Sequence, residues 1–344
     1  TQSGQRNGSL LETLDRTRTP AGARLLGRWL AEPSTDLAVI AARSGCVEAL
    51  VRQPGAAARL GEALSEVRDI PRILSRLQNR LRNPRELGGI RDTLGALPAI
   101  REELVGAGAP PLANLAAGIS PQPNLRERLR AALAEELPAD LAEGGVLRTG
   151  LDPELDRLRN LARDSKAWIS DFERGEQERT GIRSLKVRYS GAFGYAIEVT
   201  KANLHLVPAD YTRKQTMVNA ERFTTEELRT KEREVLRADE QALAREQELF
   251  QSLVGEVLAV AESLQSTAQA LAEADVLLGW SDLAREGDWT RPVVDDSDRL
   301  EIEEGRHPVV ERMLRERPGA AAFVPNDTQL AASGEQVALI TGPN

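Results

Sequence analysis

The sequence predicts a mainly α-helical protein with long helical arms, a small β module inserted between them, and the first strands of a further domain at its C-terminus. Aromatic residues make up 3% of the 344 residues, whereas Ala, Leu, Arg and Glu are abundant, which is typical of packed helices. Residues 182–222 contain runs that alternate apolar and polar side chains, the period of a β-strand. Residues 225–279 contain no proline, as a long helix requires. At this length we expect two or three domains.

The composition also excludes several kinds of protein. The net charge is −8 and the isoelectric point is near 5.2, so the chain as a whole has no basic field, although a local basic patch can still bind nucleic acid. The single cysteine, Cys46, excludes an internal disulfide, and the two histidines predict neither a metal nor a catalytic cluster. No apolar run approaches the roughly 20 residues of a membrane span. We expect a piece of a longer cytoplasmic protein.

Helix signals follow one another along the first third of the chain. Thr19 and Pro20 predict an N-cap and a first helical residue, for a helix that ends at Pro33. A second helix is expected over residues 37–51, with Pro54 after it. The apolar side chains of the first helix recur on one face, which predicts packing against other helices.

Residues 59–106 predict a series of short amphipathic helices. Three prolines are expected to separate them: Pro71, Pro84 and Pro98. The arginines of this segment favour a solvated helix face paired with glutamates over a nucleic-acid surface. These arginines are Arg72, Arg76, Arg80, Arg82 and Arg85. Residues 110–123 predict a loop-rich link, and residues 125–137 predict another helix.

The β module lies between two predicted arms. Asp152 and Pro153 predict the start of a helix that runs to Thr180. Residues 184–190 and 195–201 then alternate with a period of two around a glycine-bearing link, which predicts a β-hairpin.

A seven-residue repeat dominates the segment after the module. Apolar side chains recur at Leu236, Leu243, Phe250, Val257, Leu264, Leu271 and Leu278. The companion positions Asp239 and Glu246 are acidic, so a strict two-stranded coiled coil is disfavoured. We expect one helix over residues 225–279 that packs first on the preceding arm, antiparallel to it, and then within a helical body.

The last segment has a different character, with short apolar runs between prolines and aspartates. Residues 291–294, 299–302 and 336–340 predict strands of a new domain. The final run leads into Thr341-Gly-Pro-Asn344, which resembles the opening of a phosphate-binding loop whose lysine and hydroxyl residue would follow.

The β module has a charge opposite to that of the chain. Residues 183–222 contain seven basic and three acidic residues, a net charge of +4. Phosphate-backbone binding needs such a local excess of Lys and Arg. From charge alone, an ordinary basic surface remains an equal alternative. Of the two histidines, His307 predicts a hydrogen-bonded structural role.

The chain resembles the MutS family of bacterial mismatch-repair proteins along nearly its whole length. The resemblance to the family's core begins with Thr19-Pro-Ala-Gly-Ala-Arg-Leu-Leu-Gly-Arg-Trp-Leu30. Residues 194–199 and 211–223 resemble its clamp. Residues 304–311, 323–327 and 340–344 resemble the opening of its ATPase domain. The presence of the clamp disfavours the family's clampless paralogue.

The resemblance implies a domain order for the chain. Residues 1–171 would form the first part of the core or lever domain, 172–232 the clamp, 233–281 the returning lever helix, and 282–344 the incomplete start of the ATPase domain. It also implies a homodimer that embraces double-stranded DNA at mismatches, uses ATP and magnesium, meets other mismatch-repair proteins, and works in the bacterial cytoplasm at the nucleoid. The Walker A lysine would follow Asn344, so neither enzymatic activity nor a cofactor is expected for this chain alone.

Carried over by position, the resemblance implies two sets of site residues and neither catalytic nor metal-binding ones. The DNA-contacting set is Lys201, Arg213, Lys214, Asn219 and Arg222. The partial nucleotide-binding set is Phe323, Val324, Gly342, Pro343 and Asn344. Ala196 departs from the family, which commonly has an aromatic residue there, and a small packing change is expected.

A second interpretation remains open from the residues. A structural helical-arm protein with a hinge-like tip would use the β module for dimerisation. Changing Arg213 and Lys214 would then alter association and leave any DNA binding intact.

Overall fold

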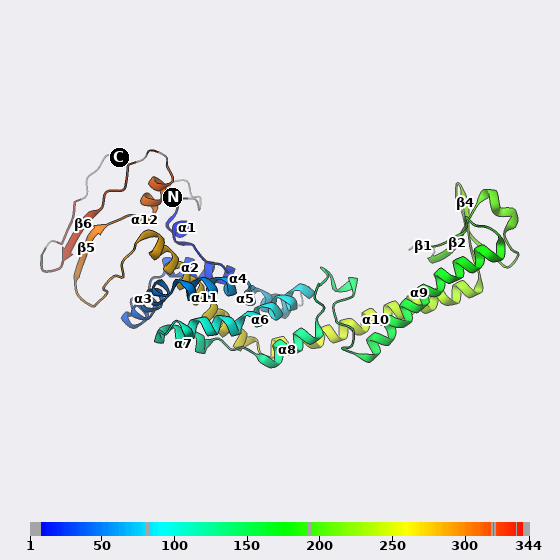
Figure 1. Cartoon of the computed structure of the whole chain (residues 1–344), viewed down its shortest axis with the longest axis horizontal. Helices are drawn as coiled ribbons and strands as arrows, with labels where there is room; N and C mark the ends of the chain where they lie inside the picture. The colour runs from blue at the N-terminus through cyan, green and yellow to red at the C-terminus, as the bar shows by residue number, and fades with distance from the viewer. Residues whose placement is uncertain are drawn as a thin grey trace. The chain divides into compact units, whose positions relative to one another are not determined.

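A computed structural model describes residues 8–79, 83–190, 194–317, 319, 321–334 and 336–339. The chain divides into two compact units (Figure 1). Unit 1 comprises Thr1–Leu81, Glu86–Arg126 and Leu258–Asn344. Unit 2 comprises Arg82–Arg85 and Glu127–Val257. Among the described residues, no helix has the length and apolar character needed to cross a membrane.

Unit 1 is built around one central helix. Its helices are α1 (Leu10–Leu14), α2 (Pro20–Ala31), α3 (Leu37–Arg52), α4 (Pro54–Ser65), α5 (Ile70–Gln78), α7 (Pro110–Gly118) and α11 (Ala261–Gly287), together with most of α6 (Pro84–Gly106). Helix α11 contacts α2, α3, α4, α5 and α7, and most of its side chains are buried. The predicted N-cap Thr19 and first helical residue Pro20 are confirmed, because the Thr19 side chain accepts a hydrogen bond from the Gly22 backbone.

Two predictions about proline in this region are wrong. Pro98 lies inside the continuous helix α6 instead of separating two helices. Leu94, Leu97 and Ile100 on either side of it are fully buried, so packing of the apolar face outweighs the lost backbone hydrogen bond. The predicted link after Pro110 is helix α7, in which proline occupies the first turn, where its missing N–H costs nothing.

One buried carboxylate joins the start of α2 to α11. Asp275 is fully buried and accepts hydrogen bonds from the Thr19 backbone N–H at 2.8 Å, the Thr19 hydroxyl at 2.7 Å and the Arg18 backbone N–H at 2.9 Å. Burial raises the pKa of this carboxyl, although the three donors oppose that shift. Cys46 is also buried in this unit, and burial raises the pKa of its thiol to about 12.

Three of the four tryptophans gather in unit 1. Trp29, Trp280 and Trp289 line an apolar cavity of about 600 Å³. The rings of Trp29 and Trp280 lie 5.7 Å apart, and the Arg43 guanidinium lies 3.5 Å from the centre of the Trp29 ring. This cluster lies at the C-terminal end of α11.

Unit 2 contains two antiparallel arms, α9 (Pro153–Thr180) and α10 (Glu226–Ala259). Asp152 caps α9 by accepting from the Leu155 backbone, as predicted. The same carboxylate pairs with Arg245, whereas Lys166, further along α9, pairs with Asp239, earlier in α10. These two ion pairs fix the antiparallel direction. The arm is preceded by α8 (Pro123–Ala132) and the 3-10 helix η1 (Leu141–Glu143), so the helix predicted over 125–137 ends five residues early.

The helix predicted over residues 225–279 is two helices. Val260, with φ −112° and ψ 20°, separates α10 from α11. The last five side chains of the seven-residue repeat are buried, but Leu236 and Leu243 are only half-buried. Because burial continues across Val260, the apolar pattern contains no sign of the one-residue break.

The β module is a four-stranded antiparallel sheet at the end of the two arms (Figure 1). Its strands are β1 (Lys186–Ser190), β2 (Gly194–Thr200), β3 (Thr212–Thr216) and β4 (Ala220–Thr224), in the order β1-β2-β4-β3, and η2 (Lys201–Leu206) follows β2. The predicted hairpin β1–β2 is confirmed, although its link at residues 191–193 lies outside the described residues. The second hairpin, β3–β4, is not among the predictions.

One face of this sheet forms the core of the unit. Ile197, Val199 and Phe223 pack with Ile169 of α9 and Leu228 of α10. Ile197 lies opposite Phe223 in the register of β2 and β4, so these side chains project to the same face. The sheet is therefore covered by the arms on that face.

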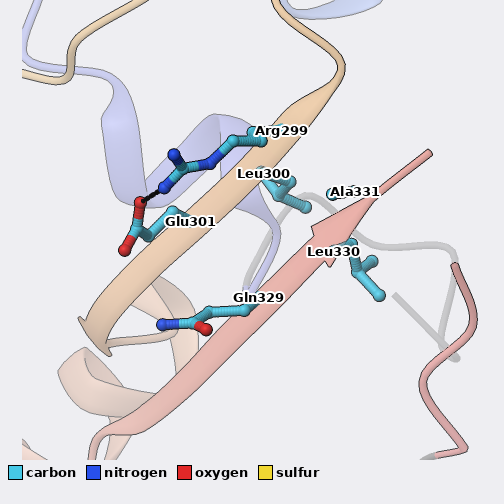
Figure 2. A pocket seen from close by; sticks show the side chains of 6 residues that line it. All are labelled: Arg299, Leu300, Glu301, Gln329, Leu330 and Ala331. Carbon is cyan, nitrogen blue, oxygen red and sulfur yellow. Dashed lines mark hydrogen bonds and ion pairs between the residues drawn. The ribbon is translucent and has the colours of Figure 1, made fainter. Parts of the chain in front are cut away.

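The C-terminal segment contains β5 (Arg299–Gly305), α12 (Pro308–Arg315) and β6 (Asn326–Ala331), with β5 and β6 antiparallel. The strand predicted from residue 299 is confirmed, and it is longer than expected. Residues 291–294 and 336–339 are not strands, and residue 340 lies outside the described residues. Figure 2 shows a shallow hollow at β5 and β6, where Arg299 pairs with Glu301.

Candidate nucleic-acid interface

The face of the sheet turned away from the arms carries a row of polar side chains, which we call the polar row. Its members are Arg188 of β1, Glu198 of β2, Arg222 of β4 and Gln215 of β3. Glu198 and Arg222 are register partners, as are Arg222 and Gln215, and both Glu198 and Arg222 alternate with buried neighbours of the core face. The row therefore crosses all four strands.

Arg222 is the centre of the polar row. Its Nε and Nη2 donate to Glu198 Oε1 at 2.9 and 2.7 Å, and its Nη1 donates to Gln215 Oε1 at 3.0 Å. Its side chain is only 16% exposed. This predicted DNA-contacting residue thus cross-links three strands of the sheet.

Two more predicted contact residues are also held by acceptors within unit 2. Arg213 Nε lies 2.8 Å from Oε2 of Glu221, a carboxylate that is 8% exposed. Lys214 donates to the Tyr195 carbonyl at 3.2 Å and lies 3.5 Å from Glu232 of α10. Arg213 compensates a buried charge, and Lys214 attaches the sheet to an arm.

Lys201 and Asn219 lie together at the end of the sheet. The Lys201 backbone N–H donates to the Asn219 carbonyl at 3.2 Å, and both side chains are exposed. The Asn203 side-chain amide donates to the Ser184 hydroxyl at 3.0 Å and to the Thr200 hydroxyl at 3.3 Å, which holds these two segments together. Arg183 precedes Ser184 and therefore lies at the same end of the sheet as Lys201. We call Arg183, Lys201 and Asn219 the tip. In the part of the chain that the structure describes, neither Arg183 nor Lys201 has a carboxylate partner.

Side chains of α9 hold the sheet in place beneath the tip. Glu173 accepts from the Val187 backbone at 2.7 Å and from Lys186 at 3.1 Å. The Tyr211 hydroxyl donates to Glu176 at 2.6 Å. Burial, and secondly this hydrogen bond, raise the pKa of the Tyr211 phenol well above its usual range. The arms therefore fix the sheet through carboxylates, and none of the described carboxylates pairs with the cations of the tip.

Sequence reasoning placed all these residues in one basic module but could not distinguish their roles. Of the five predicted contact residues, the structure brings Lys201 and Asn219 together at the tip, and it places the other three in internal contacts. Arg183 and Arg188 were counted as basic residues but were not predicted as contacts. Strand register distinguishes the cations held in internal contacts from those that are exposed, and a count of charges along the sequence does not contain this information.

The predicted nucleotide-binding residues do not form a described site. Phe323 is half-buried, and Val324 is 74% exposed on the segment before β6. Gly342, Pro343 and Asn344 lie outside the described residues. Phe323 and Val324 are not among the described residues that line the hollow of Figure 2. His307 caps α12 by accepting from the Val310 backbone, which confirms its structural role.

Comparison with known proteins gives a consistent result. A family model described as MutS domain III matches residues 1–281. The DNA mismatch repair protein MutS of Anaeromyxobacter dehalogenans is 47% identical over 99% of this chain and 39% of the relative. The corresponding protein of Symbiobacterium thermophilum is 44% identical over 100% of this chain and 39% of the relative. The corresponding protein of Myxococcus xanthus is 46% identical over 100% of this chain and 38% of the relative.

The chain spans about two fifths of the length of these relatives, 38–39%. A match of this extent and identity, together with the helical body, the antiparallel arms and the inserted sheet, shows the family. The chain belongs to the MutS family of DNA mismatch repair proteins.

Proposed function

We propose that this chain is the lever-and-clamp section of a mismatch-recognition protein, with the domain boundaries given above. In this proposal the tip of the sheet binds phosphates of duplex DNA. Helices α9 and α10 couple that contact to the ATPase end of the longer protein. The observation that carries it is the pair of exposed cations, Arg183 and Lys201, which lie at the end of a rigid sheet without carboxylate partners among the described residues.

The physical argument rests on counterion release. Duplex DNA holds a condensed layer of cations, and each protein cation that reaches a phosphate displaces part of it. An exposed Lys or Arg without an intramolecular partner does this without leaving a carboxylate uncompensated. Asn219 adds a neutral donor that suits a phosphate oxygen.

Contacts of this kind do not distinguish bases, so the chain alone should bind matched and mismatched duplexes equally. The same proposal places the longer protein in a homodimer around double-stranded DNA, with ATP and magnesium at its other end and further mismatch-repair proteins as partners. Its site of action would be the bacterial cytoplasm at the nucleoid. This chain alone should not hydrolyse ATP.

Filter binding of a radiolabelled duplex at about 50 to 200 mM salt tests the proposal. Log affinity falls linearly with log salt concentration, and the double variant R183A/K201A should make this fall less steep. The slope should decrease in magnitude by roughly two, one for each lost phosphate contact. A control variant, R163A/R174A, removes the same number of charges from exposed positions of α9 that pair with Asp164 and Asp171. It should leave the slope unchanged.

An unchanged slope in the folded R183A/K201A chain would overturn the proposal. Sedimentation of the same variants tests the structural alternative. If the tip served dimerisation instead, R183A/K201A would lower the sedimenting mass and would leave DNA binding as it was.

A further inference from the structure

We infer that the face of the sheet turned away from the arms contains a second phosphate-binding position, formed by Arg188 of the polar row. The inference rests on the proposed function, since its ligand is a phosphate of the duplex that the tip contacts. Arg188 differs from Arg222, the other cation of the row, in how it contacts Glu198.

Glu198 faces two arginines but depends on one of them. Both hydrogen bonds to its Oε1 come from Arg222, at 2.9 and 2.7 Å. The Nε of Arg188 lies 3.4 Å from Oε2, which is within the range of an ion pair but beyond the usual length of a charge-assisted hydrogen bond. Arg222 alone therefore compensates the carboxylate, and Arg188 is a surplus positive charge.

Exposure also separates the two arginines. The side chain of Arg188 is 66% exposed on the edge strand β1, whereas that of Arg222 is 16% exposed on the inner strand β4. Arg188 can turn toward a ligand while Glu198 keeps its two hydrogen bonds from Arg222. Movement of Arg222 would instead break three hydrogen bonds across the sheet.

The other paired cations of the sheet lack this freedom. Arg213 is the ion-pair partner of Glu221, so its departure would leave a buried carboxylate uncompensated. Lys186, two residues from Arg188 on the same strand, donates a hydrogen bond to Glu173 at 3.1 Å, a closer contact than that of Arg188 with Glu198. With two arginines and one carboxylate, the polar row has a net charge of +1, and Arg188 carries the excess.

The test compares R188A with K186A in the same salt titration of the labelled duplex. Both variants remove one cation of similar exposure from β1, 66% and 53%. We expect R188A to lower the salt slope by roughly one, and K186A to lower it by much less. R188K, which keeps the charge, should restore most of the slope. Circular dichroism checks folding, and R188Q replaces R188A if that variant does not fold.

The outcomes separate this inference from the proposed function. If R188A leaves the slope unchanged while R183A/K201A lowers it, the tip binds DNA and the inference about Arg188 is wrong. Equal losses in R188A and K186A would also overturn it, because they would indicate a general effect of net charge. If none of the variants changes the slope, the proposed function itself fails.

Discussion

Asp69 performs two tasks with one carboxylate. It caps α5 by accepting from the Arg72 backbone N–H, and it receives two hydrogen bonds from the Arg24 guanidinium of α2, at 2.8 and 2.7 Å. The paired hydrogen bonds from Arg24 are the main cause of a lowered pKa at Asp69. A single side chain thus defines where α5 begins and which helix lies beside it.

That lowered pKa predicts a pH dependence of stability. A carboxyl whose pKa is lower in the folded chain stabilises it above the unfolded pKa, about 3.9, and loses this contribution as pH falls through the folded value. R24Q should therefore lower the free energy of unfolding by about 0.5–1 kcal/mol at pH 7, a small value because Arg24 is half-exposed. The difference from the parent chain should narrow as the pH falls from about 4 toward about 3. Urea unfolding at both pH values measures it.

The control is R28Q, four residues further along the same helix. Arg28 is exposed and has no carboxylate partner among the described residues. Its replacement should change stability little at either pH. A loss in R24Q that persisted unchanged at low pH would show that packing of the arginine stem, and not its charge, stabilises the contact.

At the scale of elements, the sequence predicted helix starts well and helix interruptions poorly. Thr19 and Asp152 have short-range hydrogen-bonding partners, so their roles can be recognised locally. Whether Pro98 ends a helix depends on the tertiary packing that buries Leu94, Leu97 and Ile100 beside it, and the local sequence does not contain that packing. Proline position alone therefore overpredicts the number of helices.

Pro98 itself provides a test at this scale. Its side chain is exposed, so P98A should restore a backbone hydrogen bond without disturbing the core. After allowing for the greater freedom of the unfolded chain, we expect a gain of about 1–2 kcal/mol in the stability of unit 1. Amide hydrogen exchange along α6 measures it. The comparison variant G95A, at an exposed glycine of the same helix, should raise the stability of unit 1 by about 0.5–1 kcal/mol. A loss of stability in P98A would contradict the argument.

The missed hairpin β3–β4 has a physical explanation. Strand β3 reads Thr-Arg-Lys-Gln-Thr, without an apolar alternation, and it has a register shift between Arg213 and Gln215. Its connection to β4 contains Val218 and Asn219 but lacks the glycine that signals a tight hairpin. Because β3 is an edge strand, pairing with β4 defines it more than its own sequence does.

At the scale of the whole molecule, the two units should respond to mutation separately. Glu246 of α10 is nearly fully buried within unit 2. It accepts from Gly145 and Leu147 backbone N–H groups at 3.0 and 2.8 Å, and from Arg159 at 2.7 Å. This carboxylate therefore holds the segment before α9 against α10. The seven-residue repeat assigned Glu246 to a weak companion position and gave no sign of this role.

E246A should lower the stability of unit 2 by about 3 kcal/mol, because it leaves Arg159 and two backbone donors without their acceptor. Hydrogen exchange should show faster exchange of the Gly145 and Leu147 amides, with the α11 core around Leu277 unchanged. E248A, two residues along α10 and 69% exposed, is the matched control and should have little effect. Equal loss of protection in both units would indicate that they unfold as one.

The distribution of tryptophan gives each unit its own optical reporter. Trp29, Trp280 and Trp289 surround one cavity in unit 1, whereas Trp168 stacks on Phe172 in unit 2 at 5.0 Å. Replacement of Trp168 by phenylalanine would leave tryptophan fluorescence from unit 1 alone, and the difference from the parent tryptophan emission would belong to the arms and the sheet. Binding at the tip and events at the α11 end can thus be followed without an added label, at separate points along the chain.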